Sequence, residues 1–302
     1  MPPEQLAPIR AGLLARRAAP TPPVEVRRAG FEAQMAALPV DPEVSVEPLD
    51  LGGVPALRSR HGEASGRALL WLHGGAFVLG SAASYRPFAA RLARACGCDV
   101  IVPDYALAPE HTFPAAHDDA LAGLDALEGH GYAMADSAIG GDSCGANLAL
   151  AAVQARIALG AAAPAALWLI SPFLDLTHSG ASIAERAARD PFIDPAGMPE
   201  TARTYLGEAD PADPRASPLF GSLAGLPPAL IQIGSDEVLF DDAARLRDGI
   251  AAAGGRPVFQ EWAGMIHVWP LFAHVVDEGD WAIRQGAAFL GGAWAPPVAS
   301  DG

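Results

Sequence analysis

A serine at position 143 has the sequence setting of an enzyme nucleophile. It lies in the segment Gly141-Asp142-Ser143-Cys144-Gly145, which fits the pattern Gly-x-Ser-x-Gly. An apolar run precedes this segment and an alanine-rich helical pattern follows it, so we expect a sharp turn between a strand and a helix. Glycines permit a strained turn, and the first N–H groups of the helix would face negative charge that develops beside the serine. The segment therefore predicts hydrolytic chemistry.

A serine hydroxyl needs a general base, and three histidines follow Ser143 in the chain: His178, His267 and His274. The expected order of such a site is serine, acid, histidine. His178 precedes any acid in the expected late position, and His274 lies within the last helical pattern. His267 lies between the last expected strand and the last expected helix. We therefore predict that His267 is the base.

The carboxylate that orients this base should follow the strand expected over residues 229–234. Asp236 and Glu237 are adjacent there, and either carboxylate is able to accept the imidazole N–H. Asp241 and Asp242 begin the next expected helix, where negative charge stabilises the N-terminus. Local chemistry leaves Asp236 and Glu237 as alternatives.

A second motif, His73-Gly74-Gly75-Ala76, follows a buried apolar run. Its small residues leave backbone N–H groups exposed, and these are suited to bind a developing oxyanion together with the N–H of Cys144. We predict an oxyanion hole formed by Gly74, Gly75, Ala76 and Cys144. His73 precedes the serine, and we expect it to hold the loop by hydrogen bonds.

The elements that must position these residues alternate along most of the chain. Continuous apolar runs are typical of parallel strands buried on both faces, and helical patterns separate them. Such alternation predicts an α/β fold with a mostly parallel sheet and helices on both faces. We expect a first hairpin over 44–51 and 54–59, and further strands over 68–72, 99–103, 137–141, 166–171, 229–234 and 257–262.

The alternation stops over residues 178–226, which are rich in Pro, Asp and Ala. An insertion between parallel strands emerges at their carboxyl ends, where α/β active sites lie. We therefore expect 178–226, with N-terminal helices over 1–40, to cap a core formed by 41–177 and 227–295.

Four apolar side chains are candidates for the wall of the substrate site: Phe192, Met198, Tyr205 and Trp269. Ordinary packing within the cap is the alternative for each of them.

The composition excludes several other chemistries. All 20 basic residues are arginine, so a Schiff-base lysine, a P-loop lysine and a Ser-x-x-Lys pair are impossible. The net charge of −15 argues against nucleic acid or an anionic membrane as a partner. An odd count of three cysteines (Cys96, Cys98 and Cys144) suits a reducing compartment, and Cys-x-Cys alone is a poor metal site. With no secretory or membrane-spanning pattern, we expect a cytoplasmic protein without a bound metal.

Five motifs in their order along the chain resemble the bacterial hormone-sensitive-lipase-like esterases, the GDXG carboxylesterases. The resemblance runs from about residue 40 to 290. It implies an α/β-hydrolase fold with an eight-stranded sheet and a helical cap, no cofactor, and hydrolysis of short-chain esters. A homodimer is a further expectation, and the segment 235–239 is similar to monoterpene ε-lactone hydrolases. The five motifs are residues 73–76, 104–111, 141–145, 171–177 and 234–239.

The resemblance also favours Glu237 as the acid, with Asp236 as the alternative. The family's usual signature is Asp-Pro-Leu, and Leu239 puts Glu237 in the position of that Asp. Two departures concern the oxyanion hole. Ala76 replaces a glycine but retains its N–H, and Cys144 replaces a common alanine, so its side chain should narrow the pocket.

Two other functions remain alternatives. An amidase or carbamate hydrolase would use the same three catalytic residues. A non-catalytic ligand receptor, as in the plant gibberellin receptors that resemble this family, would have lost the histidine that is present here as His267.

Overall fold

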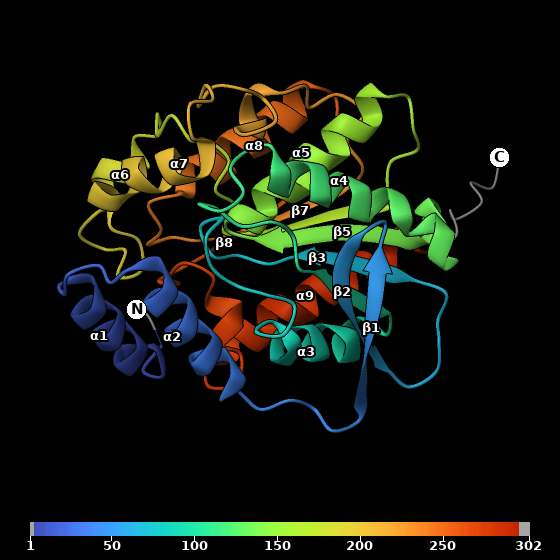
Figure 1. Cartoon of the computed structure of the whole chain (residues 1–302), viewed down its shortest axis with the longest axis horizontal. Coiled ribbons are helices and arrows are strands. Elements are labelled where there is room, and N and C mark those ends of the chain that lie inside the picture. Colours follow the sequence, from blue (N-terminus) through green and yellow to red (C-terminus); the bar gives the residue numbers. More distant parts are fainter. Residues whose placement is uncertain (1–2, 296–302) are drawn as a thin grey trace.

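An eight-stranded sheet forms the centre of the molecule (Figure 1). The computed structural model describes residues 3–295. The strand order is β1-β2-β4-β3-β5-β6-β7-β8; β2 pairs antiparallel with β1 and β4, and all the other pairs are parallel. The predicted α/β fold with a mostly parallel sheet is confirmed. The strands are β1 (Val44–Leu51), β2 (Val54–His61), β3 (Ala68–Leu72), β4 (Asp99–Pro103), β5 (Ser137–Asp142), β6 (Ala166–Ile170), β7 (Ala229–Gly234) and β8 (Val258–Trp262).

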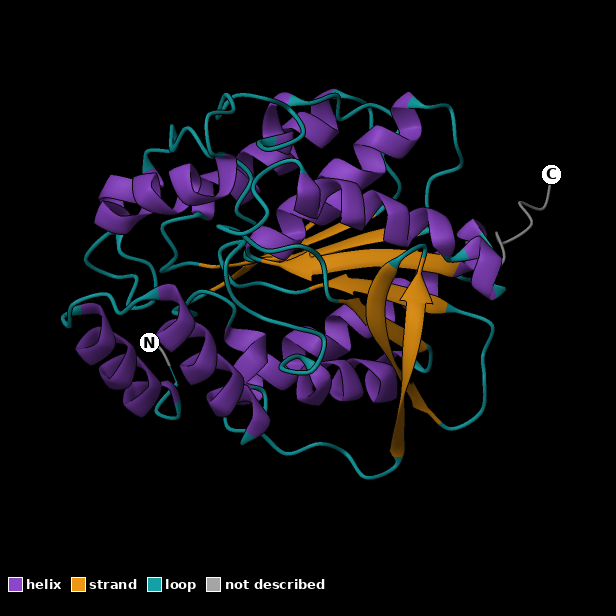
Figure 2. Ribbon diagram, viewed as in Figure 1, coloured by secondary structure: helices purple, strands orange, loops and turns teal. Residues whose placement is uncertain are grey.

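Helices cover both faces of the sheet (Figure 2). One face carries α3 (Arg86–Cys96) and α9 (Asp277–Ala293), and the other carries α4 (Ala115–Ala126), α5 (Cys144–Ala158) and α8 (Phe240–Ala252). Strands β3 to β7 are buried along their whole length, as their continuous apolar runs predict.

Large aromatic side chains fix the packing of the α3–α9 face. Trp71 of β3 and Trp168 of β6 meet edge to face, with ring centroids 5.3 Å apart, and Phe88 of α3 lies 5.5 Å from Trp71. Gly286 of α9 packs on Trp168 so closely that a Cβ there would lie 1.9 Å from the indole. A larger residue at 286 would therefore lift α9 from the sheet.

A second group of helices lies beyond the end of the sheet to which the β5 arrow points (Figure 1). It comprises α1 (Leu6–Arg17), α2 (Val24–Ala36), α6 (Ser182–Glu185) and α7 (Met198–Leu206). The predicted N-terminal helices and the predicted insertion therefore lie at the same end of the molecule. Short 3-10 helices complete the chain: η1 (Glu128–His130), η2 (Met134–Asp136), η3 (Pro195–Gly197), η4 (Pro218–Phe220) and η5 (Trp269–Phe272).

The predicted strands begin and end within a residue or two of the observed ones. The strand expected to reach 171 ends at Ile170, because Ser171 turns the chain with a φ of 48°. Within residues 3–295, none of the helices combines the length and apolar character needed to cross a lipid bilayer.

Candidate active site

Ser143 occupies a strained turn between β5 and α5. Its backbone has φ 54° and ψ −121°, which exposes the side chain between the last strand residue and the first helical residue. A Cβ on Gly145 would lie 1.9 Å from the carbonyl oxygen of Leu72, and a Cβ on Gly141 would lie 2.4 Å from the carbonyl carbon of Gly145. Only glycine fits at either position, so the two flanking glycines permit the turn that presents the serine.

His267 connects this serine to a carboxylate. Its Nε2 lies 3.0 Å from Ser143 Oγ, and its Nδ1 lies 2.9 Å from Glu237 Oε2. A carboxylate only accepts, so Nδ1 carries the proton and Nε2 is free to accept from the serine hydroxyl. The three predicted residues therefore form one hydrogen-bonded chain, with Ser143 partly exposed and the other two buried.

Two further donors hold the Glu237 carboxylate. Its Oε1 accepts from Ser171 Oγ at 2.8 Å and from the N–H of Gly234 at 2.6 Å. Ser171 Oγ in turn accepts from the N–H of Val268, directly after the histidine, at 3.0 Å. Ser171 therefore links the acid to the histidine loop. Sequence reasoning singled out no role for it, and its only signal was its place in the resemblance motif 171–177.

Asp236, the alternative acid, lies elsewhere. Its Oδ2 accepts from Arg10 of α1 at 2.8 Å, and its Oδ1 accepts from Ser235 Oγ at 3.4 Å. Neither oxygen contacts the imidazole. Because successive residues of this turn point in different directions, Glu237 reaches the histidine and Asp236 reaches the N-terminal helix.

Burial and charge have opposite effects on the pKa values of the buried pair His267 and Glu237. Burial lowers the pKa of His267, but the hydrogen bond and the charge of Glu237, with the charges of Asp190 and Asp142, outweigh it and raise the pKa. Burial raises the pKa of Glu237, and its hydrogen bonds to His267, Gly234 and Ser171 oppose that change. The carboxylate thus stabilises a proton on the imidazole, as a general base requires.

The predicted oxyanion donors are only partly free. The N–H of Gly74 donates to the hydroxyl of Tyr85 at 3.0 Å, and that hydroxyl donates to Asp142 Oδ2 at 2.7 Å. The prediction for Gly74 is therefore wrong, because its N–H is consumed inside the loop. Gly75 and Ala76 are partly exposed, and the N–H of Cys144 begins α5 beside the serine, so these three residues remain as candidate donors.

Aromatic packing holds the oxyanion loop in a strained shape. Ala76 and Phe77 have φ values of 57° and 62°. The His73 ring stacks on Tyr105 with centroids 4.2 Å apart, its Nδ1 lies 2.9 Å from Gly74 O, and burial lowers its pKa to about 4. His73 is thus a neutral, structural residue, as its position before the serine indicates.

Of the four candidate wall residues, Phe192 is partly exposed and the other three are buried. Phe192 covers the imidazole of His267 edge to face, with centroids 5.3 Å apart, and is partly exposed. Tyr205 stacks on Phe77 at 3.7 Å and, like Met198, is buried in the main core. Trp269 packs in a separate core cluster with Leu6 of α1. Trp269 is therefore a packing residue, which corrects its assignment to the substrate wall.

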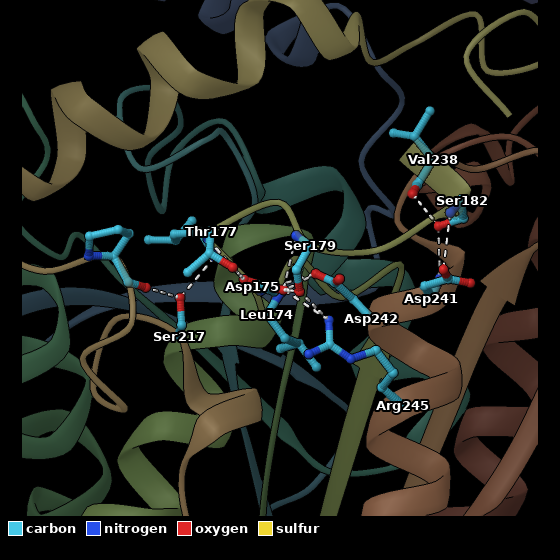
Figure 3. Close-up of polar contacts among 12 residues, drawn as sticks. Leu174, Asp175, Thr177, Ser179, Ser182, Ser217, Val238, Asp241, Asp242 and Arg245 are labelled. Atoms are coloured by element: carbon cyan, nitrogen blue, oxygen red, sulfur yellow. Dashed lines mark hydrogen bonds and ion pairs between the residues drawn. The ribbon is translucent and has the colours of Figure 1, made fainter. Parts of the chain in front are cut away.

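A polar network anchors the start of the inserted segment (Figure 3). Asp242 of α8 accepts from the N–H groups of Leu174 and Asp175 at 2.7 and 3.1 Å. Asp175 accepts from Arg245 at 2.8 Å, and Ser182 donates to the carbonyl oxygen of Val238 at 2.6 Å. These bonds fix the start of residues 174–182 to α8 and their end to Val238, in the loop that carries Glu237.

Comparison with known proteins gives relatives along nearly the whole chain. A family model described as alpha/beta hydrolase fold matches residues 69–271. An acetyl-hydrolase of Streptomyces hygroscopicus is 42% identical over 270 residues, covering 88% of this chain and 89% of its own. An esterase of Acinetobacter venetianus is 36% identical and covers 83% of both chains. The crystal structure of an esterase from the bacterial hormone-sensitive lipase family superimposes with a TM-score of 0.94 at 36% identity, over 98% of this chain and 100% of that one.

Proposed function

Because the chain belongs to the bacterial hormone-sensitive-lipase-like carboxylesterases of the α/β-hydrolase superfamily, we propose that it hydrolyses esters of short-chain acids through Ser143, His267 and Glu237. The hydrogen-bonded chain from Glu237 Oε2 through the imidazole to Ser143 Oγ carries this proposal. It joins a nucleophile, a base and an orienting acid in the order that acyl transfer needs.

The first half of the reaction forms an acyl-enzyme. His267 Nε2 takes the proton of Ser143 as Oγ bonds to the ester carbonyl carbon, and the carbonyl oxygen becomes an oxyanion. The N–H groups of Gly75, Ala76 and Cys144 are positioned to bind it, and each such donor is worth on the order of 3 kcal/mol. When the carbon–oxygen bond to the alcohol breaks, the imidazolium returns its proton to the leaving oxygen.

The second half repeats these steps with water. His267 takes a proton from water as the water oxygen bonds to the acyl carbon, and the same N–H groups bind the second oxyanion. Cleavage of the bond to Ser143 Oγ frees the acid, and the proton on His267 returns to the serine. Protons balance over the cycle, so Ser143, His267, Glu237 and the three N–H donors suffice for ester hydrolysis.

Packing beside the oxyanion donors supports a short acyl group. Cys144 is fully buried, and its Sγ accepts from the N–H of Phe77 at 3.2 Å. The Phe77 ring is itself buried and stacked on Tyr205. We infer that these side chains limit the room next to the carbonyl carbon, and the Streptomyces relative is itself an acetyl-hydrolase.

A panel of p-nitrophenyl esters tests the proposal. We expect kcat/KM to be highest for acetate or butyrate and to fall for octanoate and longer chains. Ser143→Ala should lower kcat by roughly 10⁴-fold or more with an unchanged circular dichroism spectrum. Cys144→Ala should move the preference toward longer acyl chains.

Three results would contradict the proposal. They are retained turnover in pure Ser143→Ala protein, a preference for long chains in the native protein, and faster cleavage of an acetanilide than of the matching phenyl acetate. The last result would favour the amidase alternative. A lactone in the same panel tests whether cyclic esters are also substrates.

A further inference from the structure

Arginines of helix α1 differ in what they bind. Arg10 and Arg17 both bind acceptors in the neighbouring loops: Arg10 binds Asp236, and Arg17 binds backbone oxygens of the inserted segment at 2.8 and 3.0 Å. The side chain of Arg16, next to Arg17 in the chain, makes no hydrogen bond or ion pair with any residue between 3 and 295, and it keeps solvent access. Arg10 and Arg17 dock the helix, which leaves the guanidinium of Arg16 without an acceptor.

Helix α2 repeats this arrangement. Arg28 donates to both carboxylate oxygens of Glu110 at 2.7 Å and to the carbonyl oxygen of Val78 at 2.8 Å. The side chain of its neighbour Arg27 makes no hydrogen bond or ion pair in the described part of the chain, although the charge of Glu200 on α7 attracts it. In each N-terminal helix, a docking arginine (Arg17 in α1, Arg28 in α2) thus stands next to an arginine whose side chain has no hydrogen-bonded acceptor.

Arg16 lies beside the candidate active site. The guanidinium carbon of Arg16 lies over the ring of Phe192, 5.3 Å from its centroid, and the same ring is 5.3 Å from the ring of His267. A single aromatic side chain therefore separates Arg16 from the imidazole. Arg27 of α2 carries a second positive charge toward this side: burial lowers the pKa of Arg16, and the charge of Arg27 lowers it further.

Two cations that repel each other and have no hydrogen-bonded acid are unfavourable, and this chain has 35 acidic residues and a net charge of −15 from which to supply partners. A carboxylate or phosphate group of a ligand would relieve the repulsion between the two guanidinium groups, because a guanidinium binds such a group through two parallel hydrogen bonds. The missing partner is therefore expected to arrive with a ligand.

The reaction geometry indicates which part of the substrate would carry this carboxylate or phosphonate group. His267 must protonate the leaving alcohol, so the ring that covers the imidazole lies on the alcohol side of the ester. We infer that Arg16 and Arg27 bind a carboxylate or phosphonate group on the alcohol part of the substrate. The preferred substrates are then short-chain acyl esters of alcohols that carry a carboxylate or phosphonate group. This inference rests on the proposed esterase function.

Matched substrates test it. The probes are 3-(4-acetoxyphenyl)propanoate, the phosphonate 2-(4-acetoxyphenyl)ethylphosphonate, and the neutral 3-(4-acetoxyphenyl)propanamide, each followed by acetate release. In the native protein at low ionic strength we expect kcat/KM to be about tenfold higher for an anionic probe than for the amide, mainly through KM. Salt should reduce the ratio, because exposed charges are screened. The larger of the carboxylate-to-amide and phosphonate-to-amide ratios of kcat/KM identifies the anionic group that the two arginines prefer.

Variants locate the effect. In the double variant Arg16→Gln/Arg27→Gln the anion-to-amide ratio should fall to about one, whatever happens to turnover of the amide. The matched control is Arg256→Gln, which removes the same charge before β8, at the other end of the sheet, and should leave the ratio unchanged. A native ratio of one or less, a ratio that survives the double variant, or an equal loss in Arg256→Gln would overturn the inference. Failure of Ser143→Ala to abolish turnover of all three probes would instead overturn the proposed function.

Discussion

Arg10 of the N-terminal helix binds Asp236 Oδ2 at 2.8 Å, and this contact accounts for the carboxylate next to Glu237. One acid of the adjacent pair orients the imidazole, and the other attaches α1 to the same turn. The same arginine also donates to the carbonyl oxygen of Arg189 at 2.8 Å. The helix over the site is therefore tied directly to the loop that carries the proposed catalytic acid.

Substitution of the two carboxylates should separate their roles. Glu237→Ala removes the partner of His267 Nδ1, and we expect kcat to fall by roughly 10²- to 10⁴-fold, as for other acids of such triads. Asp236→Ala breaks only a half-buried ion pair, so kcat should change by about fivefold or less. Steady-state kinetics on p-nitrophenyl acetate measures both.

Arg10→Ala is the control for the Asp236 result. If the ion pair only anchors α1, then Arg10→Ala and Asp236→Ala should share one modest loss of melting temperature, and the double variant should add little to either. A larger kcat loss in Asp236→Ala than in Glu237→Ala would assign the acid to Asp236 instead.

Ser171→Ala should slow the reaction without weakening substrate binding. Its hydroxyl donates to Glu237 Oε1 and accepts from the N–H of Val268, so its loss leaves both groups less well held. We expect kcat to fall about 5- to 50-fold, consistent with one or two kcal/mol per lost hydrogen bond, with KM changed by less than about twofold. Ser171→Thr retains the hydroxyl and should recover part of the loss. An unchanged kcat in Ser171→Ala would remove this residue from the site.

Local sequence is sufficient to predict the strands of the sheet and two of the site residues, Ser143 and His267. Continuous apolar runs predict the buried strands, because a parallel strand covered on both faces has no polar side. Ser143 and His267 follow from position, since a nucleophile needs a strand-to-helix turn and its base follows the last strand. Both requirements concern neighbours in the chain, so a single sequence contains them.

Contacts between distant segments are what local sequence lacks. Asp236 and Glu237 are chemically equivalent until Arg10, 226 residues away, binds one of them. The Gly74 N–H looks free in the motif, but Tyr85, on a turn eleven residues later, accepts from it. Trp269 follows the histidine and yet packs against Leu6 near the start of the chain. In each case the deciding partner is brought in by tertiary structure.

On the acidic side of the pH profile, activity should be half lost at a pH above the usual pKa of an imidazole. The hydrogen bond and charge of Glu237 outweigh burial and raise the pKa of His267 from its usual 6.5. A base acts only when it is unprotonated, so activity should fall as the pH drops through a value above 6.5. Glu237→Gln keeps an acceptor but removes the charge, and the midpoint of its residual kcat/KM should move to lower pH. A midpoint that stays in place or rises in Glu237→Gln would contradict this electrostatic role.

Asp190, in the inserted segment, should prove essential for keeping Phe192 and Glu237 in place. It is fully buried, its Oδ1 accepts from the N–H groups of Phe192 and Ile193 at 2.8 and 3.0 Å, and its Oδ2 accepts from the N–H of Val238 at 3.0 Å. Asp190→Asn puts an amide NH₂ against one of these donors. The cost of a buried unsatisfied donor is about 1–3 kcal/mol, or a melting temperature lowered by roughly 2–10 °C.

The catalytic effect of Asp190→Asn should be separable from this loss of stability. The charge of Asp190 is one of those that raise the pKa of His267, so its removal should move the acid limb to lower pH as well as lower kcat. Asp194→Asn is the matched control: that side chain lies four residues on, is exposed, and caps a short 3-10 helix through the N–H of Ala196. It should change the melting temperature by about 2 °C or less and leave the pH profile in place. If the two variants behave alike, Asp190 only stabilises the inserted segment, and the position of Phe192 over His267 depends on other contacts.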